Sequence, residues 1–324
     1  MPLAFHRFLL WVLFASFGMM NTALAQPYPA KPVRILVPWT PGGVTDVLTR
    51  TVAQAMSEST GQQFVVENRP GAGGTLGMNL LAKSPADGYT IAASDLPSHA
   101  ISATLYSKLP YDVLGDFEPI AMIAGSPMVL VTNPALGVHS VQDFVAFARA
   151  RPGKLSYGSS GNGSITHLAV ERFKQMAGID LVHVPYKGTV PAISSVLAGD
   201  TAIAFGTIPG VVPYAKAGKL VLLGDSFAKR FPQIQEVPAI AETLPGFDMG
   251  FYTAFFAPAR TPKEVIDRLY AETIKAFAQP KLREVYAASA AEPGTMTSAQ
   301  LRDYMAAEVK SWGEVVRTVG LKID

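Results

Sequence analysis

The sequence predicts an α/β fold of two domains, each a mostly parallel sheet flanked by helices. From residue 31 onward, short runs of β-branched and aromatic residues alternate with segments of helical period, which is the pattern of βαβ units. A second series of such units begins near residue 128, and the apolar segment 251–257 provides a return to the first series. Two domains joined by two crossing segments are expected to enclose a hinged cleft.

The elements are predicted from hydrophobic periodicity. The first strand is expected at residues 33–37, and a helix follows over 45–56, where Leu48 and Val52 lie near one face. Further strands are expected, in order, at residues 64–66, 89–92, 129–131, 181–184, 202–205, 221–223 and 251–257. Further helices are expected at residues 75–83, 141–150, 191–198, 264–278 and 298–319.

The domain boundaries follow from the order of these elements. Pro127 and Pro134 bracket the strand near residue 130, where the second series of units starts. We expect domain 1 to be discontinuous, with residues 26–127 and 253–324, and domain 2 to comprise residues 128–252.

The N-terminal segment, residues 1–25, is typical of a secretory signal peptide. The apolar run 8–20 follows Arg7 and is followed in turn by Ala23-Leu24-Ala25, a small-x-small cleavage site. A membrane anchor, the alternative, needs about 20 apolar residues, and this run is shorter. We therefore expect export and cleavage after Ala25.

Composition excludes several classes of protein. Apolar residues make up 49% of the 324 residues and charged residues 16%, which excludes a disordered chain. Lys and Arg total 27 against 25 for Asp and Glu, with no basic cluster, so no nucleic-acid partner is expected. The chain has no cysteine, which excludes a thiol nucleophile and a disulfide. No histidine pair has the i, i+4 spacing of a helical metal site, so no metal is expected.

Motifs of catalysis and of cofactor binding are incomplete. Around Ser160, Asn162 stands where a nucleophile elbow requires glycine. In the glycine-rich run that starts at Gly71, Leu76 occupies the place of the third glycine of a dinucleotide loop. We therefore expect neither a cofactor nor an enzyme.

Two strand–loop–helix junctions are the candidate binding elements. The first, 37–46, places Gly42 and Gly43 at a helix start, and the second, 157–167, combines glycines with hydroxyl and amide side chains. Free backbone N–H groups and the helix dipole favour an anion at such a position. Both loops could cradle a carboxylate, although glycine and serine are equally usual in turns and caps.

Motifs spread across the chain resemble one known family. They lie at residues 38–43 with Asp46, 66–74, 108–112 with 116–117, 161–164 with 167–168, and 184–188. Together they resemble the extracytoplasmic receptors of tripartite tricarboxylate transporters, the Bug family of periplasmic solute-binding proteins. The resemblance implies a monomeric Venus-flytrap receptor in the periplasm, whose two loops grip a ligand carboxylate and deliver it to membrane permease subunits.

The resemblance also implies a set of ligand-binding residues. These are Trp39, Thr40, Gly42, Gly43, Asp46, Ser159, Ser160, Gly161, Asn162, His167 and Thr207. Three of them have a structural alternative, because Trp39 could shield its loop, Asp46 could stabilise its helix start, and His167 could cap or pack. Arg69 is more consistent with bracing the following glycine turn and is left out.

The ligand itself stays open at this point. Two places depart from the family pattern. Family members commonly have a small residue at the position of Thr40, and they often have an acidic residue where this chain has Gly206-Thr207. Dicarboxylates, aromatic acids such as terephthalate, and amino acids all fit. Two further functions are compatible with the sequence, namely a sensor subunit that presents its liganded form to a signalling partner, and a secreted α/β enzyme acting on a carboxylated substrate.

Overall fold

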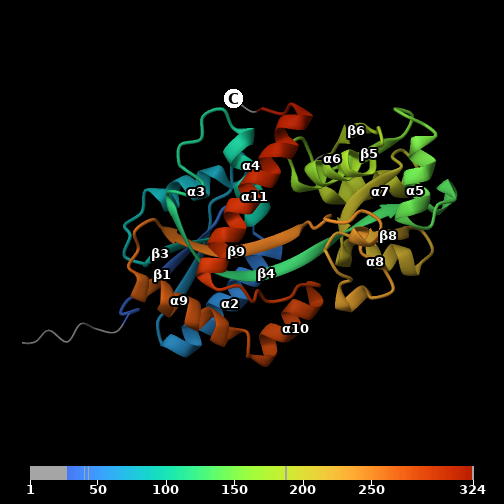
Figure 1. The fold of residues 1–324 in the computed structure, drawn as a ribbon. Helices are drawn as coiled ribbons and strands as arrows, with labels where there is room; N and C mark the ends of the chain where they lie inside the picture. The colour runs from blue at the N-terminus through green and yellow to red at the C-terminus, as the bar shows by residue number, and fades with distance from the viewer. Residues whose placement is uncertain (1–27, 40, 43, 187, 323–324) are drawn as a thin grey trace, which may run out of the picture.

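The computed structural model describes residues 28–39, 41–42, 44–186 and 188–322. Two lobes lie side by side and are joined by two long strands, β4 (Phe117–Thr132) and β9 (Gly250–Pro258) (Figure 1). The expected signal peptide, residues 1–25, lies outside the described part of the chain. Within that part, no helix is both long and apolar enough to cross a membrane.

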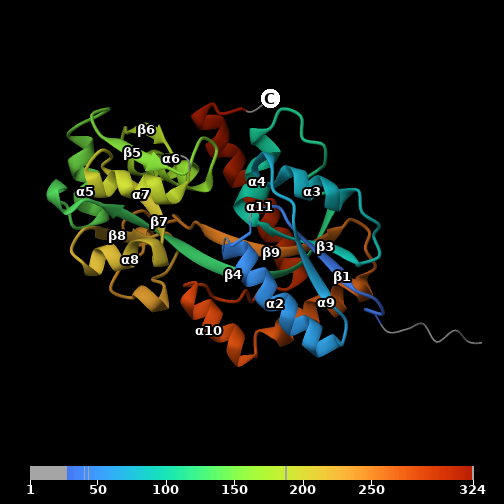
Figure 2. The same cartoon turned by 180° about the vertical axis from the view of Figure 1, so that it is seen from behind.

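The first lobe is a sheet covered by helices on both faces. Its strands run in the order β2 (Phe64–Asn68), β1 (Val33–Val37), β3 (Thr90–Asp95), β9 and β4, with β1 parallel to β2 and β3, and β9 antiparallel to β3 and β4. One face packs on the helices α2 (Val44–Thr60), α9 (Lys263–Ala276) and α10 (Pro280–Ala288), as Figure 2 shows from behind. The other packs on α3 (Thr75–Ala82), α4 (Leu96–Leu105) and α11 (Ser298–Val319).

The second lobe repeats this layered plan. Its strands β6 (Val182–Pro185), β5 (Ser156–Ser159) and β7 (Ile203–Thr207) are parallel, while β7 and β8 (Val221–Asp225) pair antiparallel with the end of β4. The helices α5 (Val141–Arg149) and α6 (Ile165–Ala177) cover one face, and α7 (Thr189–Ala198) and α8 (Ile208–Lys216) the other. Because strand side chains alternate, Leu130 of β4 packs in the core on the α5 and α6 side of this sheet, and Val129 packs in the core on the α7 and α8 side.

The strand β4 changes partners between the lobes. Residues 117–127 pair with β9, and residues 128–132 pair with β7 and β8. We expected a strand only at 129–131, and the structure extends it toward the N-terminus. Pro119 and Pro127 weaken the strand signal in the sequence, and the register shifts between Pro119 and Ala121, where the ladder is irregular.

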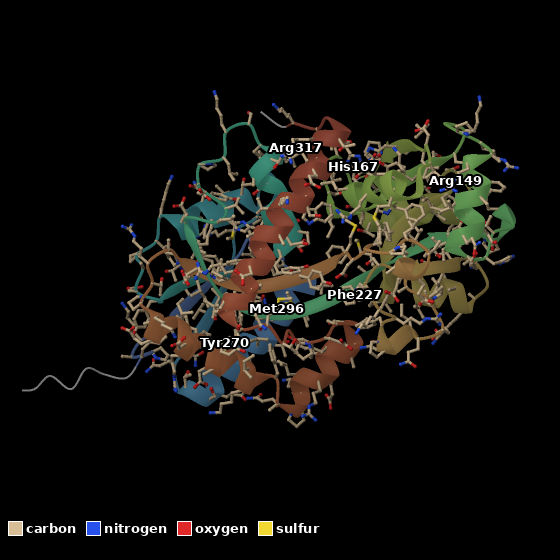
Figure 3. All side chains as sticks on the ribbon, viewed as in Figure 1. Arg149, His167, Phe227, Tyr270, Met296 and Arg317 are labelled. Carbon is tan, nitrogen blue, oxygen red and sulfur yellow. The ribbon has the colours of Figure 1, made fainter. Side chains whose placement is uncertain are left out.

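The two lobes also touch along α11. Its N-terminal half packs in the first lobe through Leu301 and Met305, while Trp312 belongs to a buried cluster that joins α4 of the first lobe to the core of the second lobe. Arg172 of α6 donates to the Ser311 hydroxyl at 2.7 Å. At the strand crossing, the ring of Phe227, labelled in Figure 3, stacks on Tyr252 with a centroid distance of 5.3 Å.

The predicted α/β class is confirmed, and most predicted elements are present. The strand Val33–Val37 and the helix Ser298–Val319 have the predicted bounds. The helices α4, α8 and α10 were not predicted, and of α6 only the start was predicted, in the junction 157–167. Burial nearly all around α4 removes the amphipathic pattern, and α8 contains Pro213, so hydrophobic periodicity could not reveal these two.

Candidate functional site

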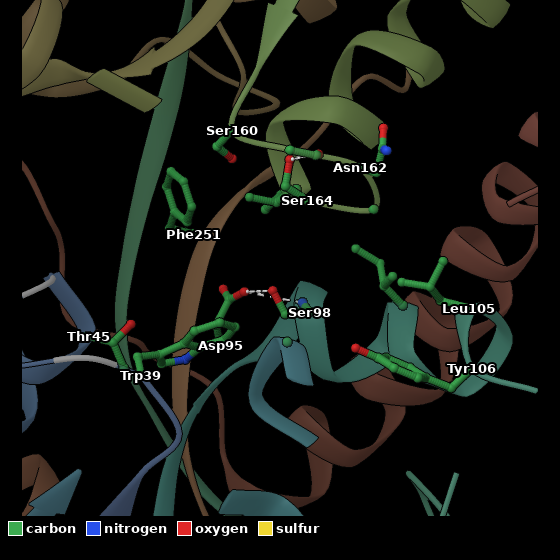
Figure 4. Close-up of a pocket in the computed structure, with 15 residues that line it drawn as sticks. Trp39, Thr45, Asp95, Ser98, Leu105, Tyr106, Ser160, Asn162, Ser164 and Phe251 are labelled. Carbon is green, nitrogen blue, oxygen red and sulfur yellow. Dashed lines mark hydrogen bonds between the residues drawn. The ribbon is translucent and has the colours of Figure 1, made fainter. Parts of the chain in front are cut away.

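A cavity of about 410 Å³ lies between the lobes, where loops of both meet (Figure 4). The first lobe contributes Trp39, Thr45, Gly73, Asp95, Ser98, Ile101, Leu105 and Tyr106. The second contributes residues 160–165, and Phe251 of β9 completes the lining. A cavity of this size fits a small organic molecule.

The second loop presents the start of α6 to the cavity. The N–H groups of Ser160, Gly161 and Gly163 already donate within the loop region, to Thr166 Oγ1, Ser159 Oγ and His167 Nδ1 at 2.9, 3.1 and 3.1 Å. The N–H groups of Asn162, Ile165 and Thr166 have no acceptor among the described residues.

These unmatched N–H groups leave the start of α6 able to donate further hydrogen bonds. Two of the three residues that carry them, Asn162 and Ile165, line the cavity. The N-terminal end of a helix carries a partial positive charge. The loop can therefore receive an anionic oxygen through its backbone.

Ser159 and His167 lie beneath the loop and not on the cavity. Both are almost fully buried, and the ring of His167 stacks on that of His183 at a centroid distance of 3.8 Å. Ser159 Oγ lies 2.6 Å from His183 Nε2. Burial, with a contribution from His183, lowers the pKa of His167 to about 4. These residues support the loop from below, and His167, labelled in Figure 3, projects from α6.

In the first loop, Trp39 lines the cavity, whereas Gly42 and Asp46 do not. Asp46 accepts from the Gly42 N–H at 2.9 Å, from Arg50 Nε at 3.1 Å and from Asn68 Nδ2 at 2.9 Å. Although burial acts to raise the pKa of Asp46, these hydrogen bonds and the Arg50 charge hold it below its usual value. Asp46 therefore fixes the loop to the helix and to β2.

The remaining predicted residues divide into two groups. Thr40 and Gly43 lie outside the described part of the chain. Thr207 is the N-cap residue of α8 and is not among the residues that line the cavity. Together with Trp39, the cavity therefore brings together Ser160, Gly161 and Asn162 from the predicted set.

Sequence reasoning missed Asp95, which ends β3 and caps α4. Its Oδ2 accepts from the Ser98 N–H at 3.2 Å and also from the Ser98 hydroxyl. Its Oδ1 is buried and has no hydrogen-bond partner in the described structure. Burial, opposed by the Ser98 hydrogen bonds, raises the pKa of Asp95 to about 6. Its place at the carboxyl end of a parallel strand was the signal that could have identified it.

Trp39 contributes a second unmatched polar atom. Its indole Nε1 is buried without a hydrogen-bond partner in the described structure, while its backbone oxygen accepts from Asn68 Nδ2 at 3.0 Å. Buried polar groups normally have partners, and this cavity lining offers one unmatched donor and one unmatched acceptor to a molecule that enters it.

Comparisons with known proteins agree with this two-lobed fold. Residues 48–321 match the sequence family TctC, described as the tripartite tricarboxylate transporter family receptor. Protein BugT of Bordetella pertussis is 36% identical over 314 residues, which is 96% of each chain. The solved structure of Rpa4515 from Rhodopseudomonas palustris with adipate has 35% identity and a TM-score of 0.76, and covers 91% of this chain and 100% of that one.

A further solved structure comes from the same organism. MatC with bound malate has 28% identity and a TM-score of 0.73, and covers 89% of this chain and 100% of that one. These matches confirm the predicted two-domain binding-protein fold and the resemblance found in the motifs. They also agree with the expectation that the chain is a receptor and not an enzyme. The chain belongs to the tripartite tricarboxylate transporter receptor family, whose members are periplasmic solute-binding proteins.

Proposed function

We propose that this chain takes a small carboxylate into the cavity between its lobes and delivers it to the membrane permease subunits of a tripartite tricarboxylate transporter. The observation that carries this proposal is the set of unmatched N–H groups at the start of α6, on Asn162, Ile165 and Thr166. The relatives solved with adipate and with malate support a carboxylate ligand.

The backbone, and not a basic side chain, holds the carboxylate in this proposal. A carboxylate at the α6 start accepts hydrogen bonds from Ile165 and its neighbours and interacts favourably with the helix dipole. Hydrogen bonds to a charged group contribute about 1.5–3 kcal/mol each, which is enough to select an anion over a neutral amide. Trp39 and Phe251 close the cavity from the other lobe and from β9.

Delivery requires that the ligand-bound and ligand-free forms differ in conformation. In this proposal the two domains move about a hinge where the strands β4 and β9 cross between the lobes. We place the domain boundary as predicted, with residues 26–127 and 253–324 in domain 1 and residues 128–252 in domain 2. The pair Pro127 and Gly250 marks the end of the β4–β9 ladder, where β4 passes to its partners in the second lobe. Closing the domains on a ligand gives the permease a surface that the empty receptor lacks.

Export to the periplasm completes the proposal. We propose that residues 1–25 are removed after Ala25, so that the exported monomer begins at Gln26. N-terminal sequencing of the periplasmic protein tests this cleavage. An uncleaved chain in the membrane fraction contradicts it.

The proposed carboxylate site is tested by removing one N–H group. Ile165 is the first residue of α6, where proline is tolerated, and Ser164 before it is extended with φ −69° and ψ 158°, which suits a following proline. Ile165→Pro removes the N–H and the side chain, while Ile165→Ala removes most of the side chain and keeps the N–H. We expect Ile165→Pro to bind a carboxylate about 10-fold or more weakly than Ile165→Ala.

Calorimetry with a panel of small carboxylates, including malate, adipate and terephthalate, measures this difference. Circular dichroism checks that both variants fold. Equal affinity of the two folded variants for every carboxylate that binds would place the anion elsewhere.

A further inference from the structure

Asp95 places a negative charge in the lining of a cavity that the proposed function assigns to an anion. The side chain is 6% exposed, and Figure 4 shows its carboxylate across the cavity from Ser160 and Phe251. Resting on the proposed function, we infer that the ligand is an amino carboxylate, whose protonated amine pairs with Asp95 while its carboxylate occupies the start of α6.

Helix capping does not account for this aspartate. Capping of α4 uses Oδ2, which accepts from the N–H and the hydroxyl of Ser98. Serine or asparagine would cap the helix equally well without a charge. Oδ1 is buried and has no partner in the described structure, so the second oxygen is unexplained by the fold. A ligand N–H group would satisfy it.

The surroundings of Asp95 favour a cation. Described residues of the cavity lining include no Lys, Arg or His, and Asp95 is their single acid. The charge of Glu308 on α11 acts in the same direction, because it also raises the pKa of Asp95 and so adds to the negative potential there. A second carboxylate on the ligand would meet this negative potential without a described basic side chain to offset it, whereas an ammonium group is attracted to it.

The space between the two charged ends is mostly apolar. Ile101, Leu105 and Phe251 line the cavity together with the ring of Trp39. An apolar or aromatic body between the amine and the carboxylate therefore fits the lining better than a polyhydroxylated one. The carboxylate of the ligand is the group that the proposed function assigns to the start of α6, and the amine is the group that Asp95 adds to this requirement.

Matched ligands separate the two ends. One set is 4-(aminomethyl)benzoate, terephthalate and 4-methylbenzoate; a second is 5-aminopentanoate, glutarate and pentanoate; a third is phenylalanine, benzylmalonate and 3-phenylpropanoate. In the first two sets, the carboxylate is kept and only the group at the opposite end changes. In the third set, only the second substituent on the carbon that bears the carboxylate changes, so this set tests an amine placed next to the carboxylate. Calorimetry at pH 7.5 measures binding of each to the wild type and to Asp95→Asn, with Asp95→Ser as a second variant that also keeps a capping residue.

The control variant is Asp303→Asn, which removes one exposed charge of α11 that does not line this cavity. In at least one set we expect the amine to bind the wild type about 10-fold or more tightly than the methyl or unsubstituted analogue. Asp95→Asn and Asp95→Ser should abolish that preference, and Asp303→Asn should keep it.

Tighter binding of the diacid than of the amine in every set overturns the inference and leaves the proposed function intact. The same holds if the folded Asp95 variants keep the preference for the amine. If no carboxylate of any set, nor malate or adipate, binds the wild type, the proposed function fails and the inference fails with it.

Discussion

Asp95→Asn should stabilise the unliganded protein. Burial, opposed by the hydrogen bonds from Ser98, raises the pKa of Asp95 from 3.8 to about 6. This difference corresponds to about 3 kcal/mol of destabilisation above pH 6, because each pKa unit is equivalent to about 1.4 kcal/mol. In the variant, an unmatched amide group and weaker hydrogen bonds from Ser98 together take back about 2 kcal/mol. The expected net gain in the free energy of unfolding is about 1 kcal/mol at pH 7.5.

The sign of the pH dependence follows from proton binding. Between pH 3.8 and about 6 the folded state holds the Asp95 proton more tightly than the unfolded state does. The contribution of Asp95 to stability is therefore greatest below pH 3.8 and is lost as the pH rises through about 6. The advantage of Asp95→Asn over the wild type should grow between pH 5 and pH 7.5.

Urea denaturation at these two pH values measures the difference, with Asp303→Asn as the control for a lost surface charge. A variant that is less stable than the wild type at pH 7.5, or an advantage that is equal at both pH values, would refute the reasoning. The first result would mean that the Asp95 carboxylate is satisfied in the unliganded protein.

Two further predictions concern His167, beneath the second loop, and Trp39, in the cavity lining. Because burial lowers the pKa of His167 to about 4 from 6.5, its neutral form stabilises the fold fully above pH 6.5, and about 3 kcal/mol is lost as the pH falls through 4. In denaturation experiments, His167→Gln should reduce the loss of unfolding free energy as the pH falls. An unchanged loss would contradict a neutral His167 stacked on His183. Trp39 lines the cavity and Trp312 packs in a core, so a ligand should change the intrinsic fluorescence of the wild type. Trp39→Phe should remove most of that change and Trp312→Phe should leave it; the opposite pattern would place the ligand away from Trp39.

The sequence predicts the layered fold well because local periodicity carries it. Strand Val33–Val37 and helix Ser298–Val319 have clear patterns, and both have the predicted bounds. The long crossing strand β4 was underestimated because Pro119 and Pro127 interrupt its pattern, and its partners come from distant parts of the chain. Pairing over such distances leaves no local signal.

The candidate site was predictable only in part for a similar reason. Trp39 and Ser160 lie next to glycine motifs that a reader of the sequence can find. Asp46 lies next to such a motif too, but Arg50 and Asn68 bind it, and the contact with Asn68 depends on the pairing of β1 with β2. Asp95 has no motif around it, and its importance appears only when β3 brings it to the cavity.

A crystal structure of the wild type with the tightest-binding amino carboxylate tests the binding mode most directly. We predict that a ligand carboxylate oxygen accepts a hydrogen bond from the backbone N–H of Ile165 or a neighbour in the α6 start. We also predict that the ligand amine lies within hydrogen-bond distance of Asp95 Oδ1. A ligand bound outside the cavity, or one whose carboxylate lies away from the α6 start, would contradict the proposed function.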